Sequence, residues 1–125
     1  GGKGKIEARN KTFKAGQILE NAGITFGLIT DAPFVPIEGQ LLQAALYVKN
    51  GLSREMALKC LTINNAIITD IDSRVGSLEP GKDADVVIWD VEPLATLSQA
   101  GIVIIDGQIA YRRKAGESNV DYQKL

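Results

Sequence analysis

Histidine is absent from the 125-residue chain, and cysteine, methionine and tryptophan occur once each. Without histidine, the chain cannot build a His-dependent catalytic triad or a zinc site with imidazole ligands of its own. Any tight transition-metal site made by this chain alone would have to use carboxylates. The single cysteine, Cys60, excludes a disulfide within the chain and indicates a reducing, cytoplasmic setting.

The chain also lacks a strong net charge and a long apolar run. Its 14 basic and 15 acidic residues leave a net charge of −1, which favours neither nucleic acid nor an anionic membrane as a partner. No apolar run is long enough to cross a bilayer, and no apolar segment follows the basic start as a signal peptide requires. The length and the 45% apolar fraction suit one domain or part of a larger one.

The first half of the chain alternates helical and strand patterns. Residues 24–29, ITFGLI, have the composition of a short buried strand. Gly23 is a suitable stop for the helix before this strand, and Ser53 a suitable cap for a later one. Apolar residues recur at helical spacing in three stretches: residues 13–22, 38–50 and 54–67. Helix, glycine and buried strand in this order are typical of an α/β unit with parallel strands.

The predicted strand ends in a single acid, Asp31, and the prolines Pro33 and Pro36 follow it. This pattern indicates either a turn or a site at the carboxyl end of a barrel strand. Cys60 lies in the apolar pattern of the last predicted helix, and we expect it to be a small buried hydrophobe and not a nucleophile.

From residue 70 onward, short apolar runs alternate with turn signals. Pro80-Gly81 fits the central pair of a type II turn, and residues 86–89 have the composition of a strand. Asp106-Gly107 between two apolar runs predicts a two-residue type I′ hairpin. The second half is therefore predicted to be an antiparallel sheet of about three or four strands, followed by a polar tail.

Two carboxylates, Asp83 and Asp85, resemble a paired catalytic site. Residues two apart in a strand share a face, but this pair directly follows the Pro80-Gly81 turn, so we expect it to have a structural and not a catalytic role. We interpret both as acceptors for turn amides that fix the start of the strand, and Lys82 as a solvated neighbour.

Residues 74–90, RVGSLEPGKDADVVIWD, closely resemble a signature near the C-terminus of metal-dependent amidohydrolases, which include imidazolonepropionase-like and dihydroorotase-like enzymes. GLSREMALKCLTINNA is similar to the family's helix pair, AGITFGLITDAPFVP to its eighth barrel strand and following loop, and VIIDGQIAY to its final hairpin. The resemblance covers roughly residues 3–112.

This resemblance implies an α/β fragment: the last strand and helices of a TIM-like (β/α)8 barrel, then a small antiparallel β-sheet that is part of a composite β-sandwich. The expected divisions are residues 1–70 for the barrel segment, 71–112 for the sheet and 113–125 for the polar tail.

The family binds one or two divalent metals, often Zn²⁺, through residues at the carboxyl ends of its strands. The ligands are an HxH pair on the first strand, a Lys or Glu on the fourth, histidines on the fifth and sixth, and an Asp on the eighth. Asp31 alone maps onto this set, as catalytic proton acceptor and metal ligand in a complete barrel. The histidine that relatives often carry next to it is replaced by Ala32.

The resemblance therefore implies the C-terminal part of a hydrolase for non-peptide C–N bonds in cyclic amides, imides or amidines. We expect this chain to be inactive alone and to bind no metal alone. Two alternatives stay open: a non-enzymatic interaction or scaffold domain derived from this fold, and a small-molecule site near Asp31. A fragment would leave residues 86–89 and 102–105 with unpaired strand edges. The expected partner is thus the missing N-terminal barrel portion or a second copy, and neither nucleic acid nor a membrane.

Overall fold

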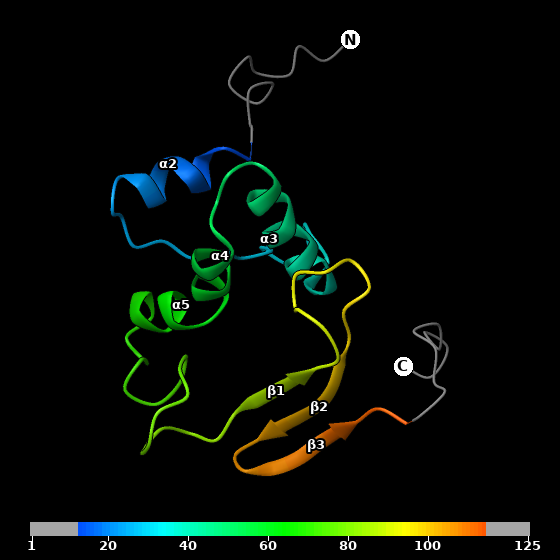
Figure 1. Ribbon diagram of the computed structural model, residues 1–125. Coiled ribbons are helices and arrows are strands. Elements are labelled where there is room, and N and C mark those ends of the chain that lie inside the picture. The colour runs from blue at the N-terminus through cyan, green and yellow to red at the C-terminus, as the bar shows by residue number, and fades with distance from the viewer. Residues whose placement is uncertain (1–12, 115–125) are drawn as a thin grey trace.

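The computed structural model describes residues 13–114, so most of the expected tail and the first residues of the expected barrel segment lie outside this range. The described part has a helical half and a sheet half, joined by loops (Figure 1). Its helices are α2 (Ala15–Asn21), η1 (Ile37–Gly39, a 3₁₀ helix), α3 (Gln40–Lys49), α4 (Arg54–Leu61) and α5 (Ile63–Ile68). Its strands are β1 (Val86–Trp89), β2 (Ala100–Ile105) and β3 (Gln108–Arg112). Across residues 13–114, no helix has the length and apolar character that a membrane span requires.

Two local signals for the helices are confirmed. Gly23 follows α2 with a φ of 68°, a left-handed conformation that glycine adopts without a steric penalty. The Ser53 hydroxyl accepts a hydrogen bond from the Met56 N–H at 3.1 Å and so caps α4.

The prediction of one continuous helix over residues 54–67 is wrong. Thr62 has φ −131° and ψ −99°, far from helical values, and it separates α4 from α5. At this break the Cys60 carbonyl accepts the Leu28 N–H at 3.0 Å. The interruption of the helix therefore provides an acceptor for a distant part of the chain.

The prediction of a strand over residues 24–29 is also wrong for the described part of the chain. The stretch crosses the helical half as a single unpaired chain (Figure 1). A β-strand is defined by a ladder with a neighbour, and the strands of the structure all belong to the separate sheet β1-β2-β3. Groups from the helices take the place of a ladder here.

The core lies in the helical half. Its buried residues are Leu28, Ala44, Leu52, Ala57, Cys60 and Leu94. Cys60 has 0% exposed surface, which confirms that it is a buried residue. Leu94 comes from the loop between β1 and β2, so this loop returns to the helices and ties the sheet half to the core. An ion pair of 3.1 Å between Arg54 and Glu92 fixes the same loop to the start of α4.

The sheet has three strands in the order β1-β2-β3, with both pairs antiparallel, as the hairpin signal predicts. Asp106 and Gly107 have φ values of 50° and 76°, the positive pair that a type I′ turn needs. Gly81 has φ 93°, and the Lys82 N–H donates to the Glu79 carbonyl at 3.1 Å, which closes the predicted turn. The prediction that residues 102–105 have an unpaired edge is wrong, because β2 is paired on both sides. Within the described residues, β1 and β3 are the outer strands.

Lys82 is not solvated as predicted: its side chain is only 14% exposed. Its ammonium group donates to the Ser77 hydroxyl at 2.7 Å and lies 3.0 Å from the Glu79 carboxylate. Lys82 therefore stabilises the turn through two residues that precede it closely in the sequence.

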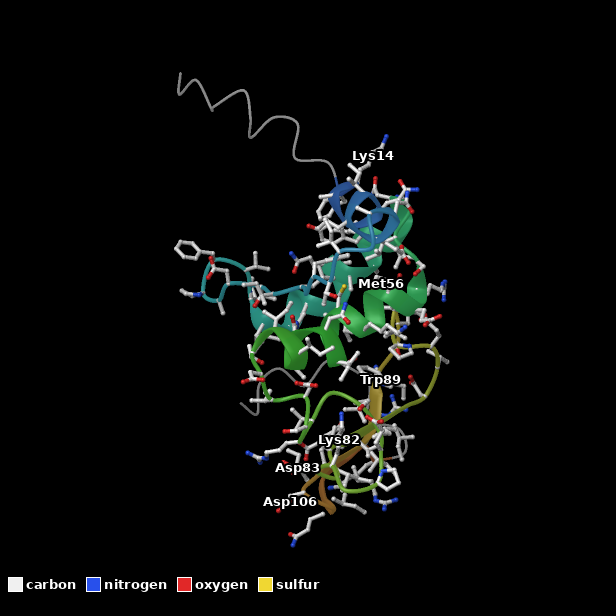
Figure 2. The ribbon with its side chains drawn as sticks, turned by 90° about the vertical axis from the view of Figure 1, so that its left-hand side faces the viewer. Lys14, Met56, Lys82, Asp83, Trp89 and Asp106 are labelled. Carbon is white, nitrogen blue, oxygen red and sulfur yellow. The ribbon has the colours of Figure 1, made fainter. Side chains whose placement is uncertain are left out.

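The two carboxylates near this turn have different structural partners. Asp85 accepts a hydrogen bond from the Asp106 backbone N–H at 2.9 Å, which confirms its role as an acceptor for a turn amide. The Asp83 side chain instead pairs with Arg74 at 2.8 Å. Figure 2 shows Asp83 and Asp106 toward the sheet end of the molecule, away from the helices.

Candidate functional site

Asp31 lies in a tight turn directly after the unpaired stretch. Its φ is 54°, the Ala32–Pro33 peptide bond is cis, and the Phe34 N–H donates to the Asp31 carbonyl at 3.0 Å. The side chain is exposed, whereas the preceding Thr30 is only 9% exposed. Within residues 13–114, the Asp31 carboxylate has neither a hydrogen bond nor an ion pair. The chain thus forms the predicted turn and leaves the carboxylate open to an external group.

Side-chain amides hold the stretch that leads to this turn. Asn64, which is 8% exposed, donates from Nδ2 to the Phe26 carbonyl at 2.9 Å. Asn65 donates from Nδ2 to the Leu28 carbonyl at 3.1 Å, and Gln40 donates from Nε2 to the same oxygen at 3.3 Å. These amides from α3 and α5 supply the donors that a neighbouring β-strand would otherwise supply.

Gly27 lies between the two held carbonyls and allows Asn65 to approach. A Cβ atom at this position would lie 1.7 Å from Asn65 Oδ1 and 2.8 Å from Asn65 Cγ. No side chain can occupy that space while Asn65 keeps its position. The glycine within the apolar pattern is therefore explained by close contact with an amide.

Sequence reasoning missed Gln40, Asn64 and Asn65. Their signal is weak but present: two adjacent asparagines stand in the middle of an otherwise apolar helical pattern. Asparagine is a poor helix former because its amide competes for backbone groups, so such a pair indicates that the amides have partners elsewhere.

A largely apolar groove of about 1000 Å³ lies between the helical half and β1. Ile29, Leu41, Leu61, Val86 and Trp89 are among the residues that line it. Figure 2 shows Trp89 where the helices meet the sheet. Asp31 does not line the groove, so the groove and the carboxylate are two separate features of the surface.

The donor set of the described residues does not make a metal site on its own. Residues 13–114 contain no group of three or more His, Cys, Asp or Glu side chains that could hold a metal ion. Asp31 offers a single carboxylate, and a bound Zn²⁺ ion takes about four ligands. Asp31 could therefore bind a metal only together with groups from outside these residues.

The sequence model of the Amidohydrolase family matches residues 6–112 of this chain. This chain belongs to that family. It is 34% identical over 103 residues to the amidohydrolase tasK of Hapsidospora irregularis, a match covering 82% of this chain and 10% of the relative. It is 35% identical over 86 residues to an imidazolonepropionase of Shewanella baltica (strain OS185), covering 65% of this chain and 21% of the relative.

The structure is similar to the crystal structure of an amidohydrolase from Thermotoga maritima MSB8, with a TM-score of 0.81 and 38% sequence identity. That match covers 87% of this chain and 28% of the solved chain. The chain thus spans 10% and 21% of the two curated relatives. The three-stranded antiparallel sheet fits this family.

Proposed function

We propose that this chain is the C-terminal part of a hydrolase for non-peptide C–N bonds. In a complete barrel, residues 24–29, which are unpaired in this chain, would take the place of the eighth strand, and β1-β2-β3 would form part of the composite β-sandwich. The substrates proposed are cyclic amides, imides or amidines. The observation that supports this most is Asp31: an exposed carboxylate without a partner among residues 13–114, at the end of a stretch held by three amides. Family membership supports a hydrolase, and the non-peptide C–N bond is part of the proposal.

In this proposal Asp31 acts as the proton acceptor. An ionised carboxylate at the end of a barrel strand takes the proton of the attacking nucleophile and delivers it to the leaving nitrogen. Members of the family are generally metal-dependent, and a bound divalent metal activates water and polarises a substrate carbonyl. Because the described residues do not fit a metal by themselves, Asp31 is proposed as one ligand of a set that a complete barrel would supply.

The test is Asp31→Asn in a polypeptide that joins this chain to the rest of the barrel, with hydantoin and succinimide as probe substrates. Asparagine keeps the size and tolerates the positive φ but cannot accept the proton, so we expect kcat to fall about 10²- to 10⁴-fold. The matched control is Asp70→Asn, because Asp70 is also exposed with φ 60° but lies after α5. Full activity of the Asp31 variant on a probe that the parent hydrolyses would refute the proposed role.

The isolated chain is proposed to be inactive. Equilibrium dialysis against Zn²⁺ should show no stoichiometric binding, and neither probe should be hydrolysed. If the purified chain binds one equivalent of Zn²⁺ and turns over a cyclic amide, this part of the proposal is wrong.

The proposed partner of the chain is the remaining barrel polypeptide. The solved amidohydrolase is matched over only 28% of its length, and the groove beside β1 leaves apolar side chains uncovered in this chain. Mixing the chain with the separately produced barrel portion should give one sedimenting complex.

A non-enzymatic interaction or scaffold domain is the alternative, favoured by the same apolar groove. A complex whose probe hydrolysis does not require Asp31, or that has none, would support this alternative.

A further inference from the structure

We propose that Asn65 and Gln40 are positioning residues for Asp31. By holding the Leu28 carbonyl, they set the direction in which the chain enters the turn that carries the carboxylate. The functional meaning of this inference rests on the proposed role of Asp31. The dependence of the Asp31 backbone conformation on the two amides can be measured without any enzymatic activity.

Leu28 is the most firmly held residue of the approach to Asp31. Its N–H donates to the Cys60 carbonyl at 3.0 Å, and its carbonyl accepts from both Asn65 and Gln40. Its side chain is 6% exposed and belongs to the core. Backbone and side chain are thus both fixed three residues before Asp31.

The rest of the stretch has few other attachments. Among the described residues, the backbone groups of residues 25, 27 and 29 have no hydrogen bond, and Phe26 is held through its carbonyl by Asn64. Between Leu28 and the turn, the structure has no other backbone hydrogen bond that could set the course of the chain. The amides on Leu28 are therefore the last polar constraint before Asp31.

The contact between Asn65 and Gly27 shows that the amide position is specific. Asn65 Oδ1 occupies the space that a Cβ atom of any other residue at position 27 would need. The side chain lies across Gly27 and reaches the next carbonyl along the chain. The close approach to Gly27 and the hydrogen bond to Leu28 together fix the position of the amide.

The experiment uses NMR on the whole 125-residue chain, with the variants Asn65→Asp and Gln40→Glu. Each variant keeps the size of the side chain and replaces its donor by a carboxylate, which repels the Leu28 carbonyl. The control is Asn50→Asp, because Asn50 also donates from Nδ2 to a carbonyl, that of Leu46 at 2.8 Å, but lies far along the chain at the end of α3. Gln40→Glu places an acid in the first turn of α3, where the helix dipole favours it, so we expect this variant to keep the global fold.

Two readouts report the position of Asp31. The first is φ of Asp31, measured by its HN–Hα coupling and backbone chemical shifts. The second is the solvent exchange rate of the Phe34 amide, which closes the turn. We expect Asp31 to lose its single positive-φ conformation and Phe34 to exchange about five- to tenfold faster in both variants. The Asn50 control should match the parent on both readouts.

Unchanged Asp31 couplings and Phe34 exchange in both folded variants would overturn the proposal. If Asn65→Asp unfolds the chain, Gln40→Glu decides the question by the same readouts. A shifted Asp31 together with full activity of Asp31→Asn would leave the positioning intact and reject the catalytic role, so the two failures are distinguishable.

Discussion

The carboxylate of Glu20, near the end of α2, binds the first turn of α4 through Ser53. It accepts a hydrogen bond from the Ser53 N–H at 2.9 Å and a second from the Ser53 hydroxyl. The same hydroxyl accepts from the Met56 N–H, so Ser53 caps α4 and is itself fixed by a residue 33 positions earlier. The hydrogen bonds from the Ser53 hydroxyl and N–H hold the pKa of Glu20 below its ordinary value of 4.5.

Glu20→Gln should lower the midpoint of thermal unfolding near neutral pH. Because the folded chain depresses the pKa of Glu20, the carboxylate stabilises the fold fully above the unfolded value of 4.5. This stabilisation disappears as the pH falls through the lower folded pKa. The difference in midpoint between parent and variant should therefore be constant above about pH 6 and shrink below about pH 4.5.

The control for this measurement is Glu38→Gln, because the Glu38 carboxylate has no hydrogen bond or ion pair within residues 13–114. Circular dichroism follows the thermal unfolding of the parent and both variants from about pH 3 to about pH 8, a range that includes the titration of carboxylates. The result is the unfolding midpoint of each protein as a function of pH. An equal, pH-independent loss in the two variants would contradict the link between Glu20 and Ser53.

Gly27→Ala should destabilise the chain by about 1–3 kcal/mol, the usual cost of forcing an extra group into a packed site. The added Cβ would lie 1.7 Å from Asn65 Oδ1, so either the amide or the stretch must move. In an Asn65→Ala background the obstacle is gone, because the next nearest atom is the Cys60 carbonyl oxygen at 3.5 Å. There the same substitution should cost less than about 0.5 kcal/mol, which makes the two changes strongly non-additive.

Urea unfolding of the two single variants and the double variant measures this coupling. Gly39→Ala is the control, because a Cβ at Gly39 would meet Val35 Cγ1 at an ordinary 3.5 Å. If the free-energy costs of Gly27→Ala and Asn65→Ala simply add in the double variant, the two residues do not contact each other.

Cys60 should resist thiol reagents in the native chain. Its side chain has 0% exposed surface, and burial raises the pKa of its thiol, so both access and the thiolate fraction are low. We expect reaction with a chromogenic disulfide to be at least about 100-fold slower in buffer than in denaturant. Cys60 is the single thiol of the chain, so the signal is unambiguous. Equal rates in the two conditions would contradict its burial.

The elements that were predicted correctly are those that depend on neighbouring residues. The Asp106-Gly107 hairpin follows from two positive φ values, and the cap at Ser53 follows from one hydroxyl and a backbone N–H three residues on. The turn at Gly81 has the same local origin. In each case the preference lies within about four residues of sequence.

The elements that were predicted wrongly depend on contacts between distant residues. The helix break at Thr62 accompanies a hydrogen bond from Leu28 to Cys60, and no periodicity near residue 62 indicates it. The unpaired course of residues 24–29 depends on amides that lie between 12 and 38 positions away. At the candidate site, the turn at Asp31 was predictable from the prolines that follow it. The amides that hold its approach were not, because their partners are set by tertiary structure.

The isolated chain should self-associate through β1. This outer strand has the run VVIW, with Val87 44% and Ile88 47% exposed, and it borders the apolar groove. An edge strand of this kind pairs readily with another chain. The other outer strand, β3, carries the polar residues Gln108 and Arg112, which oppose such pairing. We therefore expect sedimentation to show a species heavier than the 13.4 kDa monomer.

Ile88→Lys should return the chain to the monomer, because a charged side chain on an edge strand opposes association. Ile109→Lys, on β3, is the matched control and should leave the heavier species in place, since Ile109 is similarly exposed at 54%. Circular dichroism of both variants checks that the sheet persists. A monomeric parent over a wide concentration range, or equal dissociation by the two lysines, would show that β1 is not the contact.

Addition of the remaining barrel polypeptide should also dissociate the parent assembly, because the proposed partner would cover the groove beside β1 and so compete with a second copy.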